Sequence, residues 1–185
     1  MRLMIIGLWL SVPVLAGVKV GEKAPDFSLN DENGQPVQLS DYADKIVVLE
    51  WTNPECPFVK RHLKAQTMKK LSDKYKGKVV WLAINSTHFA SQSDNLAYKQ
   101  ISDASYAVLQ DQDGTVGRAY AARTTPHMFV VNQGIVAYAG AIDDNPNGDK
   151  TEVVNYVDQA LDALLKGEAI KVSSTKPYGC SVKYK

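Results

Sequence analysis

The chain has 185 residues, with 21 Lys and Arg against 20 Asp and Glu, and a formal net charge of +1. A charge so close to zero favours neither nucleic acid nor an anionic membrane surface as a partner. The length suits one domain with a full hydrophobic core, and the sequence contains no internal repeat or low-complexity linker.

The N-terminus has the pattern of a secretory signal peptide. Arg2 supplies a positive charge, residues 3–15 are largely apolar, and Ala16 offers a small residue for cleavage. The apolar stretch is shorter than the roughly 20 residues that a membrane-spanning helix needs. We predict a signal peptide at 1–16 and a mature domain at 17–185 that is exported, with the bacterial periplasm as the expected compartment and no membrane attachment after cleavage. An N-terminal strand or core helix is the alternative interpretation.

Hydrophobic patterning in the remaining sequence predicts alternating strands and helices. The strands between helices predict a parallel centre of the sheet, and a late hairpin adds antiparallel strands. The expected fold is α/β, with a central mixed sheet, helices on both faces and an extra N-terminal hairpin. The expected elements are a hairpin at 27–39, strands at 46–51, 79–84 and 107–109, a second hairpin at 128–139, and helices at 57–75, 94–102, 115–120 and 151–166.

Cys56 lies where a buried strand gives way to a helix. The apolar run 46–49 is typical of a strand covered on both faces, and Pro57 suits the first position of a helix. Cys56 is therefore expected at the N-cap, where free N–H groups and the helix dipole favour a thiolate. Lys60, one turn later, is a candidate for electrostatic support of that charge. We predict a reactive thiol; half of a structural disulfide is the alternative.

Several motifs together resemble a known family. Residues 21–29 resemble the opening of the alkyl hydroperoxide reductase/thiol-specific antioxidant superfamily, and Cys56-Pro57-Phe58-Val59 followed much later by Thr125-Pro126 resembles thioredoxin-fold proteins. With the closing Gly179-Cys180-Ser181, the set is similar to a peroxiredoxin-like subgroup of secreted bacterial redoxins. The resemblance implies a thioredoxin-like fold in which Pro126 is cis and faces the reactive sulfur, and in which Thr125 and Pro126 position the substrate.

The sequence departs from these relatives at the reactive site. Val59 occupies the second cysteine position of the thioredoxin C-x-x-C motif, so no disulfide can form within that motif. The Pro-x-x-x-Thr/Ser-x-x-Cys motif of peroxiredoxins is also missing, which argues against peroxidase activity of the usual kind. Glu55 stands where thioredoxins usually carry Trp, and its carboxylate would oppose formation of the Cys56 thiolate.

Cys180, near the end of the chain, has two interpretations. It is either the resolving thiol, which forms a redox-active disulfide with Cys56, or half of a permanent staple that pins the tail. Both need the two Cα atoms within about 7 Å. Gly179 and polar neighbours suggest a tail that is free to swing, and we favour the redox-active interpretation.

The histidines and Arg123 are the remaining candidates. Arg123 and His127 flank the Thr125-Pro126 segment, and Arg123 is a candidate source of positive charge near Cys56. His62 and His88 are candidate metal ligands beside Cys56, but His62 lies six residues along the helix and points away from Cys56. We predict no metal site and no cofactor.

The leading hypothesis is an exported thiol–disulfide oxidoreductase with Cys56 as reactive thiol and Cys180 as resolving thiol. Its expected partners are a protein disulfide or thiol substrate, a redox partner, or a small peroxide. The alternatives are a peroxiredoxin-like thiol peroxidase, a non-enzymatic binding module or metallochaperone, and a structural domain with an inert disulfide.

Overall fold

A computed structural model describes residues 17–185, and the predicted signal peptide at 1–16 lies outside the described residues. The described part begins with the hairpin strands β1 (Ser28–Asn30) and β2 (Pro36–Gln38) and a 3-10 turn, η1 (Leu39–Tyr42). The other strands are β3 (Ile46–Trp51), β4 (Val79–Asn85), β5 (Ala107–Gln110), β6 (Thr124–Thr125), β7 (His127–Asn132), β8 (Ile135–Gly140) and β9 (Cys180–Ser181). The helices are α1 (Pro57–Ala65), α2 (Thr67–Lys74), α3 (Gln92–Ser102), α4 (Thr115–Ala119) and α5 (Tyr156–Lys166).

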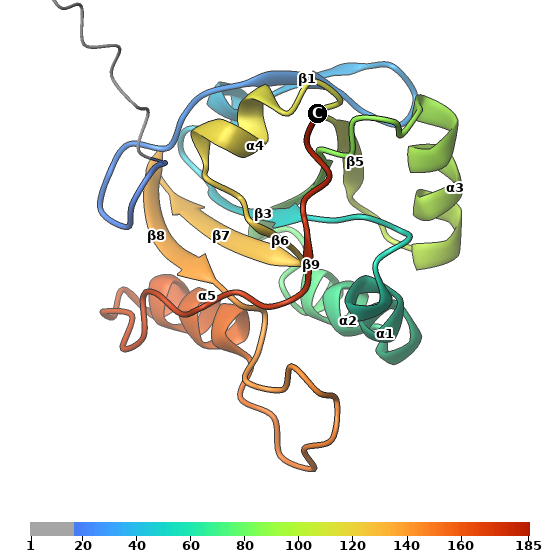
Figure 1. The fold of residues 1–185 in the computed structure, drawn as a ribbon. Helices are drawn as coiled ribbons and strands as arrows, with labels where there is room; N and C mark the ends of the chain where they lie inside the picture. The colour runs from blue at the N-terminus through green and yellow to red at the C-terminus, as the bar shows by residue number, and fades with distance from the viewer. Residues whose placement is uncertain (1–16) are drawn as a thin grey trace, which may run out of the picture.

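A seven-stranded mixed sheet, in the order β2-β1-β5-β4-β3-β7-β8, forms the centre of the fold (Figure 1). β3 pairs in parallel with β4 and antiparallel with β7, while β4 pairs in parallel with β5. The apolar run of β3 is buried because β3 has a neighbour on each edge and packed layers on both faces. The predicted α/β fold with a mixed sheet and an N-terminal hairpin is confirmed.

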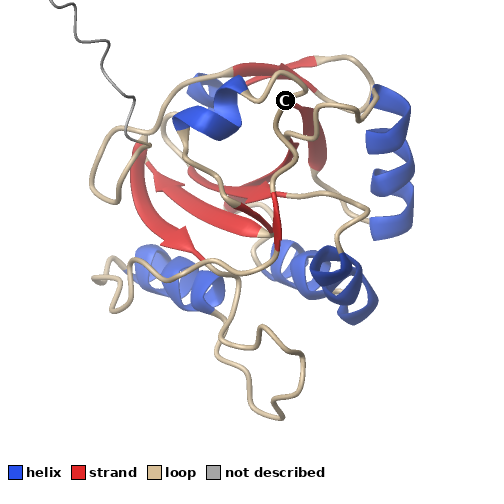
Figure 2. Cartoon of the chain, in the orientation of Figure 1, coloured by secondary structure: helices blue, strands red, loops and turns tan. Residues whose placement is uncertain are grey.

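The sheet carries a hydrophobic core on each face. On one face Val48 packs with residues of α1, α2, α3 and α5. On the other face its neighbours Val47 and Leu49 pack with α4, η1 and the N-terminal segment. The separation follows from the two-residue period of a strand, which points successive side chains to opposite faces. Helices therefore cover both faces of the sheet, as predicted (Figure 2).

Two helix boundaries differ from the prediction. The single helix expected at 57–75 is two helices, because Gln66 takes a left-handed conformation (φ 55°) that ends α1 and precedes α2. The last helix begins at Tyr156 and not near 151, because Asn155 caps it by accepting the Asp158 N–H at 2.8 Å.

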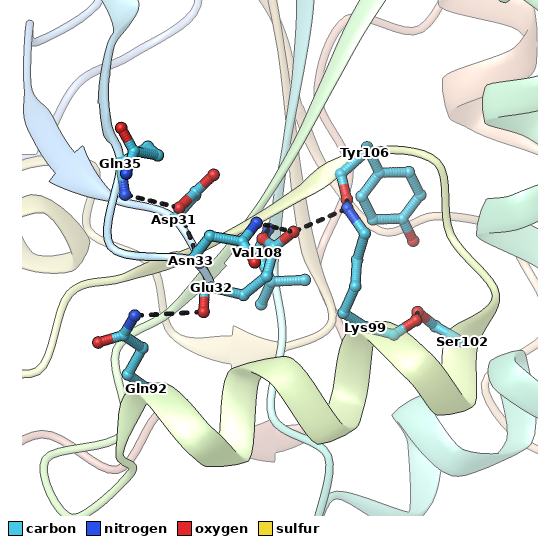
Figure 3. Close-up of polar contacts among 9 residues, drawn as sticks. All are labelled: Asp31, Glu32, Asn33, Gln35, Gln92, Lys99, Ser102, Tyr106 and Val108. Atoms are coloured by element: carbon cyan, nitrogen blue, oxygen red, sulfur yellow. Dashed lines mark hydrogen bonds and ion pairs between the residues drawn. The ribbon is translucent and has the colours of Figure 1, made fainter.

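Glu32, in the turn of the N-terminal hairpin, connects the hairpin to α3 and β5. Its buried carboxylate accepts the Val108 N–H at 2.8 Å and pairs with Lys99 of α3 at 3.0 Å (Figure 3). Lys99 also donates to the backbone oxygen of Tyr106. These contacts hold the hairpin against β5 at the side of the sheet away from β8.

The C-terminal tail is docked on the body of the protein, whereas its Gly and polar residues suggested a tail that is free to swing. It crosses the molecule toward α4, and β9 pairs antiparallel with β6, where Cys180 lies opposite Thr125 (Figure 1). Within residues 17–185, none of the helices is long and apolar enough to cross a membrane.

Candidate active site

Cys56 is the N-cap residue of α1, as the sequence predicts. Its backbone is extended (φ −71°, ψ 124°), Pro57 occupies the first turn, and the Cys56 carbonyl accepts the Lys60 N–H at 2.9 Å. The preceding loop is fixed because Asn53 accepts N–H groups from both Glu55 and Cys56. The side chain is only 2% exposed. The end of β3 and the start of α1 thus hold one sulfur in a defined, covered position.

Thr125 faces this sulfur from β6. The Cys56 thiol donates to the Thr125 backbone oxygen at 2.9 Å. The Thr125-Pro126 peptide is cis, as the family resemblance implies. The Thr125 hydroxyl is buried and, among the described residues, has no hydrogen-bond partner while Cys56 is a thiol. It is therefore available to donate to a Cys56 thiolate.

Cys180 comes to the same place through strand pairing. It is opposite Thr125 in the β6–β9 register, and it packs against the core cluster that contains Cys56. Both cysteines are free thiols, Cys56 buried and Cys180 partly exposed. The Cys180 thiol lies close enough to Cys56 for each sulfur to shift the pKa of the other. The predicted pair of sulfurs thus lies together in its reduced form.

The two thiols differ in acidity. Burial by itself raises the pKa of Cys56, but hydrogen bonds from the Cys180 thiol, the Thr125 hydroxyl and the backbone N–H groups of Val59 and Cys180 outweigh it and lower the pKa below its ordinary value. Burial, and then the hydrogen bond and negative charge of Cys56, raise the pKa of Cys180 to about 11. Cys56 is therefore the thiolate of the pair, and Cys180 keeps the proton.

Such a pair can carry out sulfur exchange. The thiolate is the nucleophile and also the better leaving group, because both depend on the lower pKa. The neighbouring protonated thiol is placed to attack a mixed disulfide formed at Cys56.

The comparisons with known proteins agree with this geometry. The family model described as AhpC/TSA family matches residues 20–139, well over half of the chain. The chain belongs to the AhpC/TSA family. Thioredoxin-like protein YneN of Bacillus subtilis is 27% identical over 147 residues, covering 79% of this chain and 81% of that protein.

Solved structures also resemble this AhpC/TSA chain. A hypothetical protein from Sinorhizobium meliloti matches with a TM-score of 0.83 and 26% identity, covering 92% of this chain and 97% of that one. A structure titled a putative thiol:disulfide interchange protein DsbE from Chlorobium tepidum matches with a TM-score of 0.58 and 25% identity, over 66% of this chain and 85% of that one. The family and these neighbours support a thioredoxin-like redoxin with oxidoreductase activity.

The two predicted cations of this AhpC/TSA site lie in different settings. Lys60 is exposed and pairs with Glu55 at 3.3 Å. Arg123 contributes its backbone to the pairing with the tail, where its carbonyl accepts the Val182 N–H at 3.1 Å. The largest contributions to the Cys56 pKa come from burial, Cys180, Thr125 and backbone N–H groups. Their electrostatic role stays a prediction.

The histidines have structural partners. His62 bonds to Thr67 and to Tyr178 of the tail, both at 3.1 Å. Burial, followed by the charge of Arg123, lowers the pKa of His127 to about 4, so this side chain is neutral near pH 7. His88 packs against Phe89. Within residues 17–185, no three His, Cys, Asp or Glu side chains gather as a metal site.

Glu50 is a titratable residue that the sequence reasoning missed. It lies on β3, six residues before Cys56, and is fully buried. The Trp81 indole N–H donates to it at 2.9 Å and the Tyr106 hydroxyl at 3.4 Å. Burial raises the pKa of Glu50 to about 7, although these hydrogen bonds lower it. A single charge inside the otherwise apolar run 46–51 was the available signal.

Proposed function

We propose that the chain is an exported thiol–disulfide oxidoreductase in which Cys56 is the reactive thiol and Cys180 the resolving thiol. The observation that carries this proposal is the pair of thiols of unequal acidity beside Thr125, Cys56 bonded to its carbonyl and Cys180 opposite it in the strand pairing. The family and the thiol–disulfide neighbours support the same reaction class. The expected partner is a protein that carries a disulfide or a thiol pair.

The reaction follows from the charges of the two sulfurs. The Cys56 thiolate attacks one sulfur of a substrate disulfide, whose S–S bond breaks, and the other substrate sulfur leaves as a thiolate. Cys180 then loses its proton and attacks Cys56 in the mixed disulfide. The second substrate sulfur leaves, the substrate is reduced by two electrons, and Cys56 and Cys180 become a disulfide. Thr125, whose carbonyl oxygen lies 2.9 Å from the Cys56 sulfur, positions the substrate sulfur beside Cys56.

Stopped-flow exchange with a model disulfide tests the roles. We expect Cys56→Ser to react no faster than an ordinary free thiol, since only the mainly protonated Cys180 remains, whereas Cys180→Ser should complete the first step and accumulate the mixed disulfide. Equal rates in wild type and Cys56→Ser would refute the proposal. A Cys56–Cys180 reduction potential well below about −300 mV would identify the pair as an inert staple instead.

A thiol peroxidase is the second candidate, favoured by membership of the AhpC/TSA family. The Cys56 thiolate would attack a peroxide oxygen, forming a sulfenic acid and releasing an alcohol or water; the Cys180 thiol would then condense with it and release water. Peroxide consumption faster than that of a free thiol, and lost in Cys56→Ser, would favour this candidate over disulfide exchange.

Export is supported by the charge, apolar stretch and small residue within 1–16. Expression of the full chain in a bacterial host with a periplasm tests it. We expect a periplasmic protein whose N-terminal residue is Gly17, and an uncleaved cytoplasmic product would contradict export.

A further inference from the structure

The segment that faces Cys56 already has a strand paired with it. Both residues of β6 are in register with β9, Thr124 with Ser181 and Thr125 with Cys180. The Val182 N–H continues the pairing to the Arg123 carbonyl at 3.1 Å. An exposed strand edge is where an extended peptide adds to a fold. Here the chain's own tail takes that position.

Tyr178 anchors the tail on the N-terminal side of β9. Its hydroxyl donates to the Asp143 carboxylate, and the Tyr178 hydroxyl oxygen in turn accepts a hydrogen bond from the His62 Nε2–H at 3.1 Å. The Tyr178 ring lies 5.9 Å from the Phe58 ring, and the Arg61 guanidinium stands 5.8 Å from its centre. Asp143 and His62 are both buried, so they form a specific binding site for the Tyr178 side chain.

Tyr184 anchors the tail on the C-terminal side. Its hydroxyl donates to the Ala122 carbonyl at 2.8 Å, and Arg118 lies 4.8 Å from the centre of its ring. A Cβ placed on Gly117 would come within 2.4 Å of the Tyr184 hydroxyl, so glycine makes room for this ring. The tail is thus held on both sides of Cys180.

Between these anchors the tail runs very close to β6. A Cβ on Gly179 would lie 2.1 Å from the Thr125 carbonyl oxygen, and Gly179 has φ +140°. Only glycine fits this approach. The tail therefore leaves no space beside Thr125 for a second polypeptide strand.

We propose that residues 178–184 select the class of substrate, by occupying the strand position that an extended polypeptide would need in order to reach Cys56. This inference rests on the proposed function. A small disulfide needs no strand edge and requires only local displacement of Cys180. A polypeptide disulfide requires release of the whole segment between Tyr178 and Tyr184. The docked protein therefore favours small disulfides, and a protein partner must first displace the tail.

Exchange rates in the full-length Cys180→Ser protein test this proposal, because only Cys56 then reacts. The two probes are Ellman's reagent, a small disulfide, and an extended ten-residue peptide whose single Cys carries the same thionitrobenzoate group. Cys56 attacks the probe sulfur and forms a mixed disulfide, and thionitrobenzoate leaves and is measured by absorbance. Tyr184→Ala in this background frees the C-terminal side of β9. Tyr156→Ala, which changes a tyrosine outside the tail, is the matched control.

We expect Tyr184→Ala to raise the peptide rate, relative to the Ellman rate, by roughly tenfold or more, with no such change in Tyr156→Ala. A chain that ends after Tyr178 should show the same increase in the ratio of the peptide rate to the Ellman rate, provided that its circular dichroism spectrum is native. Equal acceleration of both probes, or an unchanged ratio in both variants, would overturn the proposal. Failure of every variant to react with either probe would instead refute the proposed function.

Discussion

The two cysteines reach the same site by different routes, and their chemistry differs accordingly. Cys56 is placed by local structure, at the junction of a buried strand and a helix that begins with proline. Cys180 is placed by pairing with a strand more than 50 residues earlier in the chain. The first sulfur collects hydrogen-bond donors and has a lowered pKa, and the second has a pKa raised to about 11. Position in the fold, and not residue type, decides which sulfur is the nucleophile.

The largest expected effect is on the free energy of unfolding, and it comes from a side chain on the strand that leads to Cys56. Glu50 has a pKa raised from 4.5 to about 7, so its protonated form is favoured in the folded state. The stabilisation that Glu50 gives to the folded state relative to the unfolded state is complete below pH 4.5 and is lost as pH rises through 7. We expect Glu50→Gln to be about 3 kcal/mol more stable than wild type at pH 8, and nearly equal to it at pH 4.

Urea unfolding at a series of pH values measures this difference. Glu55→Gln is the matched control, because it makes the same substitution at an exposed carboxylate. The same pH dependence in Glu50→Gln as in wild type would show that Glu50 does not carry the shift.

The second prediction concerns the difference in pKa between the Cys56 and Cys180 thiols. Titration of the reduced protein, followed by thiolate absorbance at 240 nm, should show two steps, one below the ordinary thiol pKa and one near 11. Because the thiols interact, these steps belong to the pair. A single step at the ordinary thiol pKa of about 8.5 would contradict a difference in acidity between the two cysteines.

The third prediction concerns the docking of the C-terminal tail, residues 178–184, on the rest of the fold. Gly179→Ala should undock β9, because a methyl group at this position would meet the Thr125 carbonyl at 2.1 Å. We expect faster amide hydrogen exchange at residues 180–182 and a loss of about 1–3 kcal/mol in the local stability of the tail. Gly167→Ala is the control for backbone strain alone, since Gly167 also has positive φ but nothing within 4 Å of its added Cβ. Equal exchange in both variants would contradict close docking.

The smallest expected effect is on the acidity of Cys56. Cys180→Ala removes one thiol donor but leaves the backbone donors and the Thr125 hydroxyl. The pKa of Cys56 should rise, because the remaining thiolate loses one donor, and the rate of its alkylation at neutral pH should fall severalfold, as the loss of a hydrogen bond of about 1 kcal/mol implies. The pKa of Cys56 should rise less in Cys180→Ser, because the serine hydroxyl can still donate a hydrogen bond to the Cys56 sulfur. An unchanged Cys56 pKa in Cys180→Ala would show that the two sulfurs do not interact.

Features encoded in short segments were predictable from the sequence. The apolar run 46–49 and Pro57 were enough to place Cys56 at a helix N-cap, since both signals are local. The left-handed Gln66 was not predictable, because glutamine is an uncommon residue for that conformation. The start of α5 at Tyr156 depends on the capping contact of Asn155, which the apolar pattern does not report.

The docked position of the tail was not predictable from the sequence, for a physical reason. β9 is two residues long and contains no apolar alternation, so periodicity cannot detect it. Its position depends on contacts with distant groups such as His62, Asp143 and Arg118. Gly179 suggested freedom of motion, whereas in the structure it allows close contact with Thr125.

The placement of β9 also sets the order in which the site is assembled. β9 follows every other described element along the chain, so synthesis delivers Cys180 after the partners of Cys56 in β3, α1 and β6 have emerged. A nascent chain can thus build the sheet while its first cysteine still lacks the second sulfur. Formation of the redox centre is thus completed after the other described elements, and a chain that ends before Cys180 would carry Cys56 without its partner thiol.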